Sequence, residues 1–386
     1  MKKFVPSERS NISPFYAMEI LREANELSKS GNEVIHLEVG EPTSGAPPSV
    51  VKAANEILQN NISLPYTNAL GVSELREAIS EYYQNIYNFK IPMDRIAITS
   101  GSSAGYILSF LACFNPGDRI ILGIPYYPAY RNMISALGLE TVEIQTLKEN
   151  RFQLSLSQIE DLKNIKGIIL ASPSNPAGTM INDNSLQELC SFCDRTGIRV
   201  LSDEIYHGIT YEKSANSILG ISKNGIVLNG FSKFFCMTGW RLGWLVLPED
   251  LIKPIERLSQ NLFISSNALS QFSAIDAFKD IDILKNRVKI YSRNRNILIK
   301  TLNEVGISDF FHSDGAFYLY VNVSNVTDNS QHFCKKLLNE TGVAITPGID
   351  FDSINGLSYV RFSFAASESE VEEACIRIKT WISKST

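Results

Sequence analysis

Between residues 95 and 248 the chain alternates short β-branched runs with longer stretches of helical character. The runs are apolar on both faces, which is typical of parallel strands that helices cover on two sides. This alternation predicts an α/β fold built around one sheet. Each run is followed by a loop rich in Gly, Pro, Ser or Asn, where open α/β sheets bind their ligands. The expected strands are residues 95–100, 119–125, 141–146, 167–172, 199–204, 226–232 and 242–247.

The pattern changes beyond this region. Long amphipathic helices are expected over residues 248–304, and strands near residues 316–323 and 358–364 with helices between and after them. This ending predicts a second, smaller α+β unit, which agrees with about 150 residues per domain for a chain of 386 residues. A helix over residues 13–24 and a strand over residues 34–39 could pack with either unit.

The charge balance favours a small-molecule partner. Lys and Arg total 36 against 41 Asp and Glu, so the formal net charge of −5 provides no basic field for nucleic acid or an anionic membrane. The chain has no run of 18 or more apolar residues and starts without the apolar core of a signal peptide, which predicts a cytoplasmic protein. Six cysteines and four scattered histidines predict reduced thiols and no metal site. Cys190 and Cys193 form a lone CxxC whose helical spacing favours buried core thiols.

The glycine-rich loop over residues 101–105 supports two interpretations. It matches the G-x-S-x-G nucleophile elbow of serine hydrolases, with Ser103 as the nucleophile and with Asp203 and His312 following in the Ser, Asp, His order. The same loop could hold a phosphate group, because Ser102 and Ser103 open a helix whose dipole favours an anion. A phosphate dianion would also need an arginine fork.

Arg241 is the candidate for that arginine, and Lys233 precedes it in the same segment. Lys233 follows an apolar strand and lies among aromatic residues, so its ammonium group is expected in a partly desolvated site. Desolvation and a neighbouring cation both lower the pKa of a lysine, which makes the amine nucleophilic enough to form a Schiff base. A lysine among aromatic residues is otherwise most often a surface residue with its charged end in water.

Four polar or aromatic residues stand at the end of expected strands or in the loops after them. Asp203 would be costly at a strand end unless it met a cation, although it could simply cap a helix. Tyr206 and Asn175 could donate hydrogen bonds to an oxyanion, and Tyr127 could cover a planar ring. The structural alternatives are turn chemistry for Asn175 and core packing for Tyr127.

Together these residues resemble the class I/II aminotransferases of pyridoxal-phosphate fold type I, from the N-terminal helix to the last strand. The resemblance rests on Gly40-Glu-Pro, Pro65-Tyr-Thr-Asn-Ala-Leu-Gly71 with Leu75-Arg76, Thr99-Ser-Gly-Ser-Ser, Asn175-Pro-Ala-Gly-Thr, Asp203-Glu-Ile-Tyr206, Ser232-Lys with Gly239-Trp-Arg241, and Tyr359-Val-Arg-Phe-Ser. It implies a mostly parallel seven-stranded sheet in a large domain, a smaller α+β domain, and a homodimer with shared active sites. The implied division is an N-terminal arm with part of the small domain over 1–45, the large cofactor-binding domain over 46–285, and the small C-terminal domain over 286–386.

The resemblance also implies roles for the matched residues. Lys233 would hold pyridoxal 5′-phosphate as a Schiff base and act as the base that moves the substrate proton. Asp203 would keep the pyridine nitrogen protonated. Arg361 would bind the substrate α-carboxylate, helped by the backbone N–H of Gly40 and by Asn175. The other implied roles are donation to the ring oxygen O3′ by Tyr206 and Asn175, stacking on the ring by Tyr127, phosphate binding by Ser102, Ser103, Ser232 and Arg241, and contact with the neighbouring subunit's phosphate by Tyr66.

The expected activity is transamination between an L-amino acid and a 2-oxo acid. Aspartate with 2-oxoglutarate is the first expectation, and alanine or aromatic donors follow because no second arginine for a side-chain carboxylate can be located. A carbon–sulfur β-lyase on the same fold is the rival enzyme. A cofactor-binding regulatory module is the rival of another class, which the absence of a basic winged-helix segment before residue 13 or after residue 384 disfavours. The combined motifs also disfavour the serine hydrolase.

Overall fold

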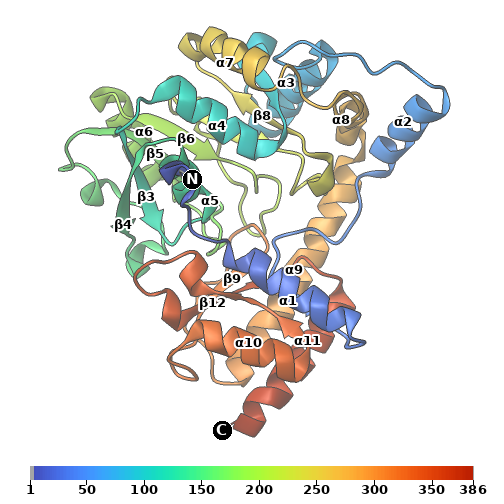
Figure 1. The fold of residues 1–386 in the computed structure, drawn as a ribbon, viewed down its shortest axis with the longest axis vertical. Helices are drawn as coiled ribbons and strands as arrows, with labels where there is room; N and C mark the ends of the chain where they lie inside the picture. The colour runs from blue at the N-terminus through green and yellow to red at the C-terminus, as the bar shows by residue number, and fades with distance from the viewer. Residues whose placement is uncertain (1–3, 386) are drawn as a thin grey trace.

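A computed structural model describes residues 4–385 of the chain. Its central sheet has seven strands in the order β2-β8-β7-β6-β5-β3-β4 (Figure 1). β8 runs antiparallel to the other six strands, so the sheet is mostly parallel, as expected. The seven strands are those predicted, with ends that differ by at most two residues: β2 Ile96–Thr99, β3 Arg119–Ile124, β4 Glu140–Gln145, β5 Ile165–Ala171, β6 Arg199–Asp203, β7 Ile226–Gly230 and β8 Gly243–Val246.

The remaining strands form two small sheets. β11 (Thr346–Pro347), β12 (Tyr359–Ser363) and β9 (Tyr318–Asn322) make an antiparallel sheet. β1 (Ile35–His36) pairs parallel with β10 (Val343–Ala344), so the N-terminal segment joins the C-terminal part of the chain. The strand expected over residues 34–39 is therefore present but only two residues long. The expected domain boundaries stay a prediction, and the second of them falls inside helix α9 (Ile281–Glu304).

Local sequence chemistry explains several helix ends. Asn182 caps α6 by accepting a hydrogen bond from the Ser185 N–H, and Gly197 ends this helix at φ 72°. Asn329 and Gly342 begin and end α10 in the same way. The helices are α1 Tyr16–Lys29, α2 Pro48–Gln59, α3 Ser73–Tyr87, α4 Gly101–Cys113, α5 Ala129–Ala136, α6 Asp183–Thr196, α7 Glu249–Leu262, α8 Ala268–Ala274, α9 Ile281–Glu304, α10 Ser330–Thr341 and α11 Glu368–Ser385.

Helices pack against the central sheet and beside the small antiparallel sheet. α4 lies against β7 and β8, while α9 extends from the neighbourhood of α8 to pack along α11 beside the smaller sheet (Figure 1). Cys190 and Cys193 are fully buried on α6, which confirms them as core residues, and all six cysteines are free thiols. Within residues 4–385 no helix is long and apolar enough to cross a membrane. Location in the cytoplasm stays a prediction.

Candidate active site

The candidate site lies at one edge of the central sheet. β2, β3, β5, β6 and β7 run in the same direction, so their carboxyl ends meet there, and the antiparallel β8 begins there. Asp203 ends β6, Lys233 follows β7, Arg241 precedes β8, and Ser102 lies in the first turn of α4 after β2. These four residues line one cavity of about 230 Å³.

Eleven of the twelve residues expected at the site line this cavity. They are Gly40, Ser102, Ser103, Tyr127, Asn175, Asp203, Tyr206, Ser232, Lys233, Arg241 and Arg361. Tyr66 is the exception, because its side chain is 81% exposed and lies outside the cavity. The role of each residue stays a prediction.

Lys233 lines the cavity, and the pKa of its amine is lowered. Its Nζ donates a hydrogen bond to the backbone carbonyl of Gly40 at 2.6 Å. Desolvation lowers the pKa of Lys233 to about 8; the Glu41 carboxylate opposes this shift, and the Arg361 and Arg241 guanidinium groups add to it. Much of the amine is therefore neutral near pH 8, which is the form that attacks a carbonyl group.

Asp203 is buried and receives three hydrogen bonds. Its Oδ2 accepts from the hydroxyl of Tyr106 at 2.8 Å and from that of Tyr130, and its Oδ1 accepts from the Ile205 N–H at 3.1 Å. Burial raises the pKa of Asp203, and these hydrogen bonds oppose the increase. Sequence reasoning assigned no role to the two tyrosines. One signal was available, because Tyr106 lies three residues after Ser103 and so shares its face of α4.

The first turn of α4 and the Arg241 guanidinium form a candidate anion site. Ser100 precedes α4, and its side chain makes no capping hydrogen bond with the helix N-terminus. Gly101 has φ +77°, and a Cβ there would lie 2.5 Å from Nη2 of Arg241, so only glycine allows the guanidinium to approach this closely. Helix N–H groups beside an arginine suit a phosphate dianion.

Arg361 projects from β12 and is held by contacts that sequence reasoning missed. Its Nη1 donates to Asn175 Oδ1 at 2.9 Å, and its Nη2 donates to the Glu38 carbonyl and to Thr346 Oγ1 at 3.3 Å. The guanidinium lies 4.5 Å from the ring centre of Tyr318. Within the described residues the buried Nε has no hydrogen-bond partner. The arrangement fixes a planar cation at the cavity wall.

Aromatic and apolar side chains complete the wall. The hydroxyl groups of Tyr206 and Tyr318 are 2.7 Å apart, and a Cβ at Gly40 would lie 1.7 Å from the Tyr318 hydroxyl. Any other residue at position 40 would therefore require the Tyr318 side chain to move. The Tyr127 ring packs edge-on against Phe15 at 5.8 Å between ring centres. The apolar lining comprises Phe15, Ala17, Met18, Val39, Met133 and Ile205, and the sequence motifs contained only the last of these.

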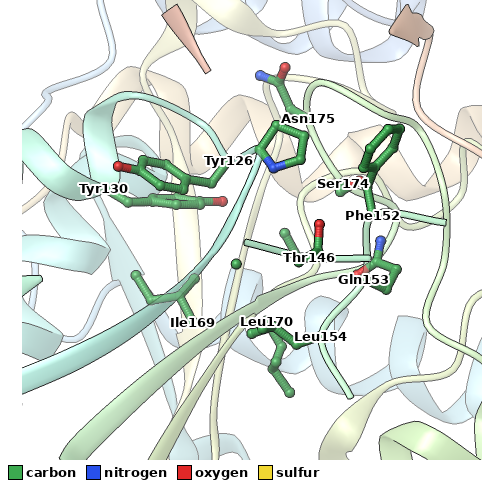
Figure 2. A pocket seen from close by; sticks show the side chains of 13 residues that line it. Tyr126, Tyr130, Thr146, Phe152, Gln153, Leu154, Ile169, Leu170, Ser174 and Asn175 are labelled. Atoms are coloured by element: carbon green, nitrogen blue, oxygen red, sulfur yellow. The ribbon is translucent and has the colours of Figure 1, made fainter. Parts of the chain in front are cut away.

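A second, much smaller cavity adjoins the first. It has a volume of about 30 Å³ and shares Tyr130 and Asn175 with the larger one (Figure 2). The buried Ser174 Oγ, which has no partner among the described residues, also lines it. A cavity of this volume has room for water but is too small for a substrate or a cofactor.

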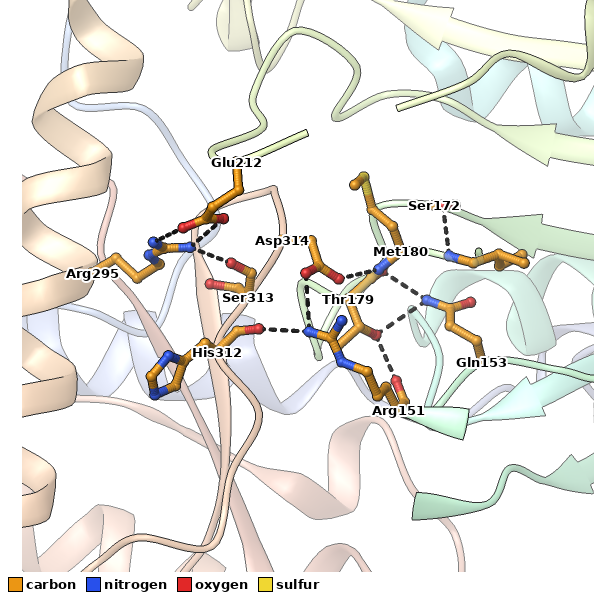
Figure 3. A network of polar contacts seen from close by, with 11 residues as sticks. Arg151, Gln153, Ser172, Thr179, Met180, Glu212, Arg295, His312, Ser313 and Asp314 are labelled. Atoms are coloured by element: carbon orange, nitrogen blue, oxygen red, sulfur yellow. Dashed lines mark hydrogen bonds and ion pairs between the residues drawn. The ribbon is translucent and has the colours of Figure 1, made fainter. Parts of the chain in front are cut away.

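The serine-hydrolase triad is not assembled. His312 lines a separate cavity of about 590 Å³ together with Arg151, Arg295 and Asp314, whereas Ser103 lines the 230 Å³ cavity. Figure 3 shows Arg151 donating hydrogen bonds to the His312 carbonyl and to Asp314. The side-chain donors to Asp203 are tyrosines and not a histidine. The G-x-S-x-G spacing therefore reflects a small-residue turn that opens α4.

Comparison with known proteins agrees with this geometry. The model of the family described as aminotransferase class I and II matches residues 32–378. A valine–pyruvate aminotransferase of Mycobacterium tuberculosis is 41% identical over 97% of both chains, and an aspartate aminotransferase of Thermotoga maritima is 31% identical over 95% of this chain and 96% of that protein. The crystal structure of an aminotransferase from Mycobacterium tuberculosis superposes with a TM-score of 0.96 at 40% identity, covering 99% of this chain and 100% of that one. The chain therefore belongs to the class I and II aminotransferase family and is a pyridoxal 5′-phosphate-dependent transaminase of fold type I.

Proposed function

We propose that this enzyme transfers the amino group of an L-amino acid with an apolar side chain to a 2-oxo acid, with Lys233 as its catalytic residue. One observation carries the proposal: an amine, a carboxylate, an anion site and a second guanidinium converge on a single cavity. Lys233, Asp203, Arg241 and Arg361 supply these groups.

The donors and acceptors of the cavity fit pyridoxal 5′-phosphate. This molecule has an aldehyde, a phosphate and a pyridine nitrogen, which suit Lys233, the α4 anion site and Asp203 respectively. When bound, it supplies an electron sink for the negative charge that develops at the substrate Cα. The further proposed contacts are phosphate binding by Arg241, Ser102, Ser103 and Ser232, ring stacking by Tyr127, and donation to O3′ by Tyr206 and Asn175.

Lys233 is proposed to take the proton from the substrate Cα and to return it during product formation. A base has to be unprotonated when it accepts a proton, and a pKa near the working pH gives the best compromise between availability and basicity. The lowering of the Lys233 pKa to about 8 supports this role. The Gly40 carbonyl, 2.6 Å from Nζ, would hold the amine in place while it is not bonded to the cofactor.

Arg361 is proposed to bind the substrate α-carboxylate. Its guanidinium is buried and held by Asn175, Glu38 and Thr346, so little conformational entropy is lost when a carboxylate binds. A planar guanidinium can form two parallel hydrogen bonds with a carboxylate. This contact would orient the Cα–H bond toward Lys233.

The apolar lining supports a substrate such as valine or alanine over aspartate. Within the described residues the cations that line the cavity are Lys233, Arg241 and Arg361, each of which already has a proposed role. The side-chain carboxylate of aspartate would meet no further cation from this chain, and burying an unpaired charge is costly. The valine–pyruvate aminotransferase among the relatives gives the same indication.

Tyr66 supports a homodimer with shared sites. Its side chain is 81% exposed, and Leu58, Ile62 and Leu64 close to it in the chain are also exposed at 59%, 54% and 40%. Apolar side chains gathered in one exposed segment are typical of an interface. We propose that Tyr66 contacts the phosphate bound by the partner subunit.

Borohydride reduction tests the central proposal. Reduction makes a Schiff base permanent, so we expect the yellow protein to retain the cofactor on the tryptic peptide that contains Lys233. Mass spectrometry of the peptides locates the label. Lys233→Ala should lose it, and Lys253→Ala, which changes a surface lysine of α7, should keep it. A label found on another lysine contradicts the proposal.

The same preparation distinguishes the substrates. Valine, alanine and aspartate are each supplied with a 2-oxo acid, and the new amino acid and any released ammonia are measured. We expect transfer from valine and alanine to be faster than transfer from aspartate, with no stoichiometric release of ammonia. Faster transfer from aspartate would refute the proposed apolar substrate. In a separate assay with cystathionine, release of pyruvate and ammonia would indicate the carbon–sulfur β-lyase.

A further inference from the structure

We infer that Tyr106 and Tyr130 are positioning residues, which keep Asp203 ionised and oriented so that the ring nitrogen of the cofactor retains its proton. This inference rests on the proposed function, in which Asp203 is the partner of that nitrogen. The two phenols are not explained by the sequence motifs, because neither belongs to a segment that the motifs assign to cofactor binding.

The geometry is specific. Tyr106 on α4 and Tyr130 on α5 approach Asp203 from two different helices, and both hydroxyl groups donate to the same oxygen, Oδ2. The two side chains are only 2% and 3% exposed, and their ring centres are 5.1 Å apart. Burial raises the pKa of both phenols well above 10, so both remain protonated and act only as donors to the carboxylate.

A count of acceptor positions shows what remains for a ligand. A carboxylate offers about four acceptor positions, two on each oxygen. The phenols occupy both positions on Oδ2, and the Ile205 N–H occupies one on Oδ1. Within the described residues, one acceptor position on Oδ1 is left, and Asp203 lines the cavity. One N–H donor, such as a protonated ring nitrogen, would fill this remaining acceptor position.

The two phenols affect the ionisation state of Asp203. Asp203 is buried, which favours its neutral form, and hydrogen bonds donated to the carboxylate favour the ionised form. Without the two phenols, the proton shared with the ring nitrogen would move to the carboxyl group. The ring would then lose the positive charge that makes it an effective electron sink.

α4 also links this effect to phosphate binding. Ser102, Ser103 and Tyr106 lie within one turn and a half of the same helix. The helix therefore contacts the proposed phosphate site with its first turn and Asp203 with the next. This sets the separation between the two ends of the bound molecule by the rigid geometry of a helix.

Nitrogen resonances of the bound cofactor test the inference directly. Wild type, Tyr106→Phe, Tyr130→Phe and the double variant are loaded with pyridoxal 5′-phosphate labelled with ¹⁵N in the ring, and the resonance is followed against pH. We expect the pH at which the nitrogen loses its proton to fall by about one unit or more for each phenol removed, the size expected for a hydrogen bond to a charged group. We also expect kcat to fall by about tenfold or more in each single variant, with little change in KM.

Tyr320→Phe is the matched control. Tyr320 is also a buried tyrosine, and its hydroxyl has no hydrogen-bond partner among the described residues. Unchanged titration in both single variants overturns the inference, whether or not the double variant folds, and so does an equal shift in Tyr320→Phe. If wild type itself fails to carry the label on Lys233, the proposed function fails instead, and the two failures are thereby distinguished.

Discussion

At the residue scale, Glu204 shows how burial controls ionisation beside the site. Its Oε1 accepts from Ser217 Oγ at 2.9 Å, from Ser202 Oγ at 3.2 Å and from the Ile218 N–H at 3.1 Å. Its Oε2 lies 3.4 Å from His207 Nδ1, but burial lowers the pKa of His207 to about 4, so this histidine is neutral at neutral pH. Burial raises the pKa of Glu204 to about 8. Glu204 is therefore protonated in the folded protein at neutral pH.

This protonation predicts a pH-dependent stability. Between pH 4.5 and about 8 Glu204 holds a proton in the folded state that it releases on unfolding, so its contribution to the free energy of unfolding should fall as pH rises through this interval. His207 contributes in the opposite sense between about pH 4 and 6.5, and this contribution is common to both proteins compared below. Glu204→Gln keeps the shape and carries no charge, so the variant should lose this component and gain stability relative to wild type toward pH 8. Urea unfolding of both proteins across the interval measures the effect. Parallel pH profiles would show that Glu204 is already ionised when folded.

At the element scale, α1 depends on a cap from the far end of the chain. Phe15 precedes this helix and provides no side-chain cap, but Asp350 Oδ1 and Oδ2 accept from the N–H groups of Tyr16 at 3.2 Å and Ala17 at 3.0 Å. Asp350 is buried in a short 3₁₀ helix, Gly348–Asp350. Because Ala17 and its neighbour Met18 line the cavity, this cap also positions part of the proposed substrate site.

Removal of the cap should loosen α1. Asp350→Ala leaves two N–H groups without a partner, which should lower the free energy of unfolding by about 1–3 kcal/mol. Amide hydrogen exchange should become faster in α1 and stay unchanged in α6, which has its own cap at Asn182. Asp350→Asn retains one acceptor oxygen, so its free energy of unfolding and its exchange rate in α1 should lie between those of wild type and Asp350→Ala. Unchanged exchange in α1 of Asp350→Ala would show that packing alone holds the helix.

At the scale of the whole molecule, a shared site predicts complementation between subunits. Tyr66→Ala removes the group proposed to reach across the interface, and Lys233→Ala removes the catalytic amine. Each variant alone should be impaired at both of its sites. A mixed dimer should contain one complete site, formed by Lys233 of the first subunit and Tyr66 of the second.

The expected result is activity in the refolded mixture above the sum of the separate variants. Lys233→Ala refolded with a second Lys233→Ala preparation serves as the control. Sedimentation analysis checks that the mixture is dimeric. A mixture no more active than its parts, although dimeric, would place Tyr66 outside the partner's site.

Most of the sheet could be predicted because strand patterns are local. Short β-branched runs located all seven strands within two residues, and residues at their ends met because parallel strands share an edge. Lys233, Asp203 and Arg241 were recognisable for this reason. The two-residue length of β1 could not be predicted, because it depends on β10, whose register pairs Ile35 with Val343.

The sequence by itself determined which chemical groups this protein has and at which strand ends they stand, because both depend on residues close together in the chain. Only the tertiary structure decided which partners surround them. Tyr106 and Tyr130 lie 97 and 73 residues from Asp203, and Glu38 lies 323 residues from Arg361. Such contacts arise from the order of the strands and from helices packing against them, and no local pattern contains either. The buried charges are therefore stabilised by groups that only the folded chain brings within hydrogen-bonding distance.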